Sequence, residues 1–298
     1  MSETAGRLKM GILFAVLSLM LVGFGGLIGY FTGYIVVWMS FFLAIAVVMN
    51  VVSYLKSDSI ALRMTKSKLV SRNDNPRLYE TVEKVASDAG IPMPRVGIMR
   101  TPIPNAFATG RDRNHSVVVA TTGILDMLND NELEAVLGHE ISHITHKDIL
   151  ITTIAATIAT IISYIGNMIM FSMFFGEGER GNNGIILLVA AILIPLGAMF
   201  VQLGISRARE TEADSGSVRL VRKPDALISA LEKISKPSRA QFSASRNPQG
   251  NSPQPGAYSS LFLVNNFGGH SLLNLFSTHP PLEKRIANIN KVRKELGI

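Results

Sequence analysis

Residues 11–55 read GILFAVLSLMLVGFGGLIGYFTGYIVVWMSFFLAIAVVMNVVSYL, and this stretch contains no charged residue. A helix rises about 1.5 Å per residue, so the run is long enough to cross a hydrocarbon layer of about 30 Å twice. We predict one span over about residues 11–28 and a second over about residues 35–55. The glycine-dense segment GFGGLIGYFTGY is expected to form the break between them. Residues 1–55 are therefore predicted to be a transmembrane hairpin.

The composition also indicates a membrane protein. Apolar residues make up 47% of the 298-residue chain, and the mean hydropathy is positive. A cleaved signal peptide is the alternative for the N-terminus, but the apolar run far exceeds the core of about 7–15 residues that such a peptide has. Two more uncharged runs, residues 149–175 and 181–206, predict a second transmembrane hairpin over residues 149–205. The chain is thus expected to contain four transmembrane helices.

Basic residues flank these spans on one side. Arg7 and Lys9 precede the first span, and five lysines and arginines lie between residues 56 and 72, whereas the loop between the first two spans has no charge. By the positive-inside rule, both termini and the polar parts, residues 56–148 and 206–298, lie in the cytosol of a multi-pass protein of the plasma or inner membrane. The net charge of +7 is mostly close to the spans and suits an anionic lipid surface.

Composition excludes some functions. We expect no nucleic-acid partner, because the chain has no basic stripe interleaved with aromatic residues. The chain has no cysteine, so any metal must be held by histidine and carboxylate.

The polar parts predict a mainly helical catalytic domain with a small β-sheet. We expect helices over residues 76–90, 129–148, 206–220, 224–235 and 279–296, and a β-hairpin formed by strands within residues 91–110 and 116–125. The segment from about 236 to 260 is rich in Ser, Pro, Gln and Gly and is predicted to be a mobile loop. The fold class expected is therefore an integral membrane α+β protein.

Residues 138–148, GHEISHITHKD, hold three of the six histidines and predict a metal site. In the pattern HExxH, His139 and His143 lie about 40° apart on one helix face and can share a zinc ion. Glu140 lies about 100° around the helix, close enough to reach a metal-bound water without occupying the metal. His146 is displaced by about 10 Å from His139 along the axis, too far to share that ion at bond lengths near 2.1 Å.

A third ligand must come from another element, and the carboxylates after the last predicted span are the candidates. On a helix, Glu210 and Asp214 share a face, whereas Glu212 lies about 200° from Glu210 and points away. From spacing alone, either Glu210 or Asp214 can bind the metal while the other braces a ligand. A solvated acidic face with partners such as Arg207 is equally consistent with the spacing.

Four segments together resemble the HtpX family of membrane zinc metalloproteases, which is similar to the CAAX prenyl endopeptidases. They are HEISH, SRARETEAD (206–214), STHPPLEKRI (277–286) and PNAFATG (104–110), and the N-terminal hairpin matches as well. The resemblance implies a zincin-type fold with one catalytic Zn²⁺ held by His139, His143 and Glu210, and Asp214 beside them. It also implies a protease that degrades misfolded or damaged membrane proteins during stress without ATP, and we expect it to cooperate with an ATP-dependent membrane protease.

The expected reaction is peptide hydrolysis. Zinc would polarise the scissile carbonyl and acidify a water, from which Glu140 takes the proton before delivering one to the leaving amine. His279 is a candidate donor to the oxyanion, because its motif matches a histidine thought to play that part in related proteases; a capping residue is the alternative. Arg207 is a weaker candidate, since an arginine just beyond a span is commonly a lipid anchor.

The segment Asn105, Ala106, Phe107 and Ala108 is predicted to be an exposed edge strand that accepts an extended peptide, although an ordinary hairpin strand fits the pattern equally well. Two other functions are alternatives. A site-2-type intramembrane protease also uses HExxH, but places it within an apolar span, whereas the sequence before His139 is polar. A non-catalytic zinc protein acting as chaperone or scaffold would have little need for Glu140.

Overall fold

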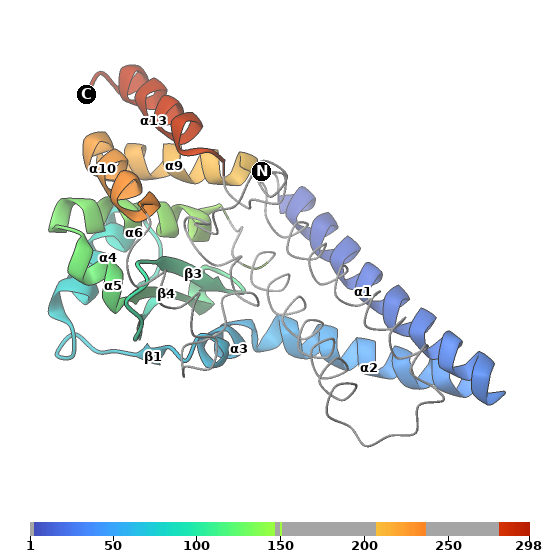
Figure 1. Cartoon of the computed structure of the whole chain (residues 1–298). Helices are drawn as coiled ribbons and strands as arrows, with labels where there is room; N and C mark the ends of the chain where they lie inside the picture. The colour runs from blue at the N-terminus through green and yellow to red at the C-terminus, as the bar shows by residue number, and fades with distance from the viewer. Residues whose placement is uncertain (1–2, 147–149, 151–206, 237–279) are drawn as a thin grey trace.

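A hairpin of two long helices projects from a mixed α and β part of the chain (Figure 1). This computed structural model describes residues 3–146, 150, 207–236 and 280–298, and every structural statement concerns these residues. The two predicted spans between residues 149 and 206 lie outside the described residues, except for Leu150. The predicted loop at 236–260 also lies outside them, except for Lys236.

The break predicted in the glycine-dense segment, residues 23–34, is confirmed, but it comes at the end of that segment. Helix α1 (Glu3–Thr32) runs past residue 28, and the chain turns at Gly33, whose φ of +81° suits glycine, before α2 (Ile35–Leu55) begins. The glycines inside α1 let α2 approach closely. A Cβ on Gly25 would lie 2.6 Å from the Trp38 carbonyl oxygen, and a Cβ on Gly29 would lie 2.4 Å from the Ile35 Cα. Small residues at such contacts are typical of helices packed within membranes.

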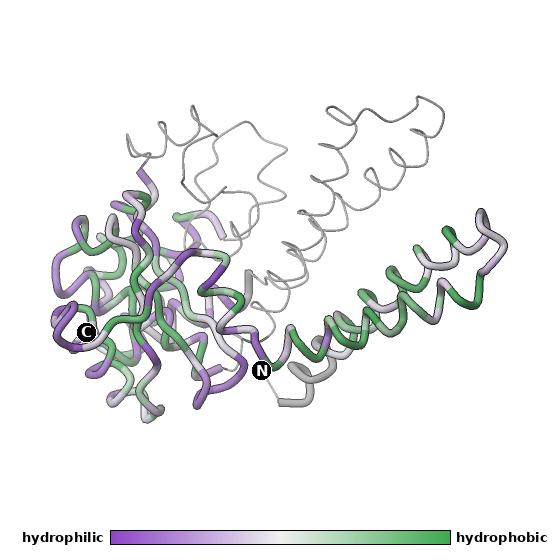
Figure 2. Tube along the Cα trace, turned by 90° about the horizontal axis from the view of Figure 1, so that it is seen from below, coloured by the Kyte–Doolittle hydropathy of each residue, from purple (hydrophilic) through white to green (hydrophobic). Residues whose placement is uncertain are grey.

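Both helices of the hairpin consist mostly of apolar residues, as Figure 2 shows along the tube. Leu19 and Val36 are among the large hydrophobic side chains that it exposes. Among the described helices, only α2 is long and apolar enough to cross a membrane, and the apolar segment of α1, Phe14–Tyr30, is shorter. Among the four predicted spans, the one over residues 35–55 therefore corresponds to a described helix, α2, that is long and apolar enough to cross a membrane.

A four-stranded sheet lies beside the base of the hairpin (Figure 1). Its strand order is β1 (Lys68–Leu69), β2 (Arg95–Met99), β4 (Ser116–Thr121) and β3 (Ala106–Gly110). The predicted hairpin is confirmed: β3 and β4 are antiparallel and are joined through the 3₁₀ turn η1 (Arg113–His115), while β2 pairs with β4 in parallel.

The second strand of the hairpin is shorter than predicted. It ends at Thr121, because the Thr121 hydroxyl accepts a hydrogen bond from the Ile124 amide and so caps helix α5 (Thr122–Met127). Sequence patterns also did not predict β1 or the short helix α3 (Ser57–Met64), which follows α2.

Helix α6 (Asp130–Thr145) is the central helix of the mixed α and β part. It lies between the sheet and the pair α9 (Arg207–Val221) and α10 (Pro224–Ser235), as Figure 1 shows. The helix begins at a capping box, since Asn129 Oδ1 accepts from the Glu132 amide and Glu132 Oε2 accepts from the Asn129 amide, both at 3.0 Å. The helix ends at Thr145 rather than at 148, with His146 as its C-cap.

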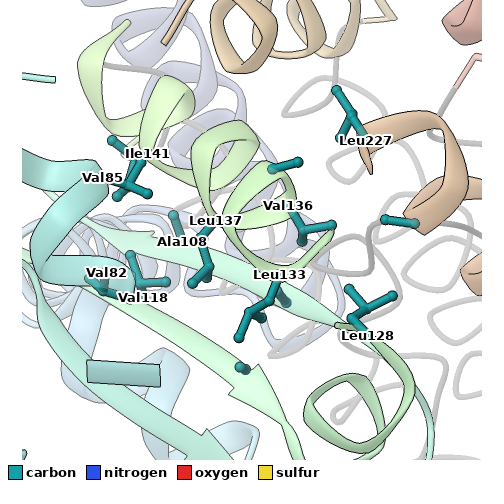
Figure 3. Packing of buried hydrophobic residues seen from close by; sticks show 14 of the residues in the cluster. Val82, Val85, Ala108, Val118, Leu128, Leu133, Val136, Leu137, Ile141 and Leu227 are labelled. Carbon is teal, nitrogen blue, oxygen red and sulfur yellow. The ribbon is translucent and has the colours of Figure 1, made fainter. Parts of the chain in front are cut away.

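The main hydrophobic core surrounds α6. Its inward side chains pack against α4 (Pro76–Asp88), the sheet and α10 (Figure 3). The fully buried ones on α6 include Leu133, Val136, Leu137 and Ile141. Burying a side chain of this kind contributes roughly 1.5–3 kcal/mol, so the core fixes α6 firmly.

The last helix, α13 (Leu282–Leu296), covers α9 and α10 on the side away from the sheet (Figure 1). It begins three residues later than predicted, after Pro280 and Pro281. The predicted helix 224–235 is confirmed as α10, and the one predicted over 76–90 as α4.

Candidate metal centre

Two helices that cross closely bring the predicted ligands together. At the crossing, a Cβ on Gly138 of α6 would lie 2.6 Å from Val221 Cγ2 of α9. A Cβ on Gly216 of α9 would lie 2.5 Å from Ser142 Oγ of α6. Because both positions are glycine, residues 139–143 of α6 come directly opposite residues 210–214 of α9.

Three of the predicted ligand residues converge at this crossing. The Nε2 atoms of His139 and His143 lie 3.2 Å apart. A carboxylate oxygen of Glu210 lies 3.5 Å from the first Nε2, and the other carboxylate oxygen lies 3.6 Å from the second. In the described part of the chain, these three residues form the one group of histidines and carboxylates close enough to hold a metal ion.

These separations fit a tetrahedral ion. Ligand atoms that each lie about 2.0–2.1 Å from zinc are about 3.3 Å from one another, which agrees with the spacings above. The donor set of two imidazoles and one carboxylate, with no thiolate, is also one that zinc accepts.

The burial of acidic groups agrees with the same fit. Three carboxylates of the cluster, Glu140, Glu210 and Asp214, are buried, and Arg285 pairs with one of them, Asp214. A divalent cation held by His139, His143 and Glu210 would supply positive charge beside the carboxylates that Arg285 does not bind. Buried charges that lack such compensation are costly.

Asp214 contacts one of the two histidines, and sequence spacing did not show which one. Its Oδ1 lies 2.9 Å from His139 Nδ1, so the histidine that it orients is His139. This contact assigns the proton to Nδ1 and leaves Nε2 free to face the other ligands. Burial alone would lower the pKa of His139, but hydrogen bonds to Asp214 and Glu210 outweigh it and raise the pKa to about 9.

Arg285 is a residue that sequence reasoning missed. It lies on α13, only 2% of its side chain is exposed, and it binds Asp214 through Nε to Oδ2 at 2.8 Å and Nη2 to Oδ1 at 2.6 Å. Burial would raise the pKa of Asp214, but the charge and hydrogen bonds of Arg285 lower it below its usual value. Asp214 is therefore held as a carboxylate between His139 and Arg285.

Glu140 is buried beside the ligands and touches the predicted substrate strand. Its Oε2 accepts a hydrogen bond from the Ala108 amide at 2.9 Å. Burial raises the pKa of Glu140 above its ordinary value, which makes its carboxylate a stronger base. The residue is thus placed where a general base for hydrolysis would be needed.

Strand β3 occupies the edge of the sheet as predicted, but its side chains are not exposed. Residues 105–108 are all at least nine-tenths buried. The Asn105 carbonyl accepts a hydrogen bond from the Thr121 amide. In an antiparallel pair, the main-chain N–H and C=O groups of successive residues point alternately toward and away from the partner strand. Those of Asn105 and Phe107 therefore point toward β4, and those of Ala106 and Ala108 point to the other side. The Ala108 bond to Glu140 agrees with that alternation.

The remaining predicted residues are placed as follows. Glu212 is exposed and points away from the ligands, as expected, and His146 is not part of the ligand cluster. Arg207 begins α9, and His279 lies outside the described residues. The roles suggested for Arg207 and His279 stay predictions.

Comparison with known proteins adds a family. Residues 72–293 match Peptidase family M48, a range that contains every residue of the metal centre. The chain is 45% identical to a protein named "Protease HtpX homolog" from Pyrococcus furiosus over 293 residues, 97% of each chain. It is 40% identical to a protein of the same name from Paraburkholderia phytofirmans over 289 residues, 96% of each chain. The crystal structure of S. mikatae Ste24p overlays with a TM-score of 0.47 and 19% identity, over 96% of this chain and 66% of that one.

Proposed function

Since the chain belongs to Peptidase family M48 and is a metallopeptidase, we propose that it is a membrane-bound zinc endopeptidase that cuts misfolded or damaged membrane proteins. The observation that carries the proposal is one buried cluster in which His139, His143 and Glu210 face one another beside Glu140. A structural metal site would have no use for a buried base at that position.

The chain's own residues divide the work of hydrolysis. A zinc ion held by the three ligands would polarise the scissile carbonyl and make a water more acidic. The Ala108 amide holds Glu140 Oε2, which leaves Oε1 to take a proton from that water and later deliver it to the leaving amine. Asp214 keeps the proton of His139 on Nδ1, so Nε2 stays directed at the ligand cluster.

A substrate in extended conformation is the form this site accepts. The main-chain groups of Ala106 and the carbonyl of Ala108 point away from β4 and are the groups a peptide would pair with, while the Ala108 amide holds Glu140 on the same side. A peptide paired with that edge would place its backbone beside the base whatever its side chains are. This supports an endopeptidase of broad sequence tolerance.

The active centre is tied to the end of the apolar hairpin. The turn after β3 contains Arg111, whose Nη1 donates to the Leu55 carbonyl at the end of α2, and Arg113, whose Nη2 donates to the Thr145 carbonyl at the end of α6. The C-termini of α2 and α6 thus meet at one turn. If α2 spans the bilayer, the metal centre lies at the membrane face and acts on segments that emerge there.

Several finer points belong to this proposal. The basic flanks of residues 1–55 support a cytosolic position for both termini and for the catalytic parts, residues 56–148 and 206–298, with a second membrane hairpin over 149–205. The membrane would be the cell membrane, crossed several times. Cooperation with an ATP-dependent membrane protease stays a prediction.

One observation weighs against the intramembrane alternative. Glu134 of α6 pairs with Lys84 at 2.7 Å and with Lys223 at 2.8 Å, and both lysines are partly exposed. Charged groups at such positions are costly inside a hydrocarbon layer. Helix α6 is therefore suited to a watery surface beside the membrane.

The test uses the full chain in liposomes with a membrane-anchored model substrate. The substrate carries an unfolded segment outside the liposome, on the side of the catalytic part, and mass spectrometry maps the sites at which this segment is cut. Cleavage close to the anchor, lost with a zinc chelator and restored by Zn²⁺, is the expected result. Cleavage that continues unchanged after the metal has been removed would overturn the proposal.

A further inference from the structure

Arg285 links the last helix of the chain to the metal centre. It lies 71 residues after Asp214 and 146 residues after His139, yet all three side chains are buried in one contact. Its guanidinium uses Nε and Nη2 to bind both oxygens of Asp214, and Nη2 lies 3.5 Å from His139 Nδ1. The mechanism above gives Arg285 no role.

We propose that Arg285 is a positioning residue of the metal centre, which orients His139 by fixing the carboxylate of Asp214. This inference rests on the proposed function, because it concerns the metal that the ligands would hold. It adds that α13 is a part of the catalytic apparatus rather than only a cover over α9 and α10.

The geometry explains why arginine is needed. A planar guanidinium binds both oxygens of a carboxylate at once and so fixes its plane, whereas a lysine ammonium acts as a single point charge. With that plane fixed, Asp214 Oδ1 stays 2.9 Å from His139 Nδ1, and the imidazole cannot turn its Nε2 away from His143 and Glu210. Without Arg285, Asp214 would be a buried charge lacking its cation and would shift toward water.

The same helix offers a matched control. Arg293, two turns further along α13, binds Asp225 of α10 through Nη1 to Oδ1 at 2.7 Å and Nη2 to Oδ2 at 3.1 Å. This pair is also two-pronged and also ties α13 to its neighbour, but it is largely exposed and does not belong to the metal centre. Losing it should weaken helix docking without turning His139.

The experiment compares the full-length chain with Arg285→Met, Arg285→Lys and Arg293→Met in detergent. Two readouts besides activity are measured: the rate at which bound zinc is lost to excess chelator, and the visible spectrum of the Co²⁺-substituted protein. Changes to residues that orient metal ligands typically cost about 10–100-fold in metal affinity. We therefore expect zinc loss about 10–100-fold faster and altered Co²⁺ bands for Arg285→Met, a smaller change for Arg285→Lys, and wild-type behaviour for Arg293→Met.

A double variant shows whether Arg285 acts through Asp214. In an Asp214→Asn background, Arg285→Met should speed zinc loss by much less than in the wild type, because its partner is already impaired. Full, independent effects of the two changes would overturn the inference. So would equal effects of Arg285→Met and Arg293→Met, which would indicate a general role in packing.

Two further outcomes are informative. Should Arg285→Met not fold, Arg285→Lys decides, and zinc loss and Co²⁺ bands identical to wild type would overturn the inference. If the wild type binds zinc and cleaves substrate, and the Arg285 variants behave in the same way, only this inference is refuted. A wild type that binds no zinc would refute the proposed function as well.

Discussion

Replacing Gly216 by alanine tests how closely α6 and α9 must approach for the metal centre to form. The new methyl group would lie 2.5 Å from Ser142 Oγ and 2.9 Å from Ser142 Cβ. Ordinary contacts between carbon atoms are about 3.5–4.0 Å, so the two helices must separate by roughly 1 Å. Rotation of the serine cannot relieve the contact with its Cβ.

The expected effect is larger on the metal than on the fold. Overpacking of this kind costs about 1–3 kcal/mol, while alanine returns up to about 1 kcal/mol of helix propensity. Net destabilisation should therefore be about 0–3 kcal/mol. A displacement of about 1 Å at a catalytic site can nevertheless cost about 100-fold in rate, and Glu210 lies on the helix that moves.

The assay measures zinc content after dialysis, together with the thermal unfolding midpoint of the same preparation. Gly216→Ala should fold but retain much less zinc, and the added change Ser142→Gly should restore zinc by removing the clashing atoms. The control is Gly23→Ala in α1, where a Cβ would meet nothing within 4 Å among the described residues. Full zinc retention in Gly216→Ala would refute the claim that this close crossing assembles the site.

Other predictions concern the third ligand and the cap of α6. Glu210→Ala should lower zinc content much more than Glu212→Ala, because only Glu210 lies beside the two histidines; equal losses would contradict that ligand choice. Burial would raise the pKa of Glu132, but hydrogen bonds from Lys233 and Ser229 lower this pKa below its usual value of 4.5. The ionised Glu132 therefore stabilises the fold fully above pH 4.5, and this stabilisation is lost as the pH falls through the lowered pKa. Glu132→Gln should therefore lower the free energy of unfolding by about 1–3 kcal/mol at neutral pH, and the difference from wild type should become smaller in acid. A difference that does not depend on pH would refute the role of the ionised Glu132.

Local signals in the sequence were sufficient for several elements. The helix predicted from residue 129 and the HExxH spacing placed the start of α6 and the residues that share a face, because both features depend on neighbours within one or two turns. Pro224 at the first turn likewise marked the start of α10. The small sheet followed from short apolar runs separated by turn residues.

Features that depend on distant partners were missed or misinterpreted. The glycine-dense segment predicted the turn, but not that Gly33 alone forms it while Gly25 and Gly29 allow the close approach of α2, because only the position of α2 distinguishes these two uses of glycine. Spacing placed Asp214 on the face of Glu210, yet the histidine that it binds depends on how α6 crosses α9.

Arg285 did leave a signal in the sequence. It occupies the inward stripe of α13 formed by residues 282, 285, 289, 292 and 296, where a lone arginine is unusual. That pattern indicates a buried cation. It could not identify Asp214 as the partner, because the two residues are 71 positions apart.

The measurement that tests the account most directly is cleavage by the Glu140→Gln variant with its zinc content determined in the same sample. Glutamine keeps the shape of the side chain and can still accept from the Ala108 amide, but it cannot take a proton from water. We predict wild-type zinc content with cleavage of a model substrate lost by at least about 100-fold, as expected for removal of a general base. Cleavage at the wild-type rate with zinc retained would contradict the assignment of this buried cluster as the protease active site.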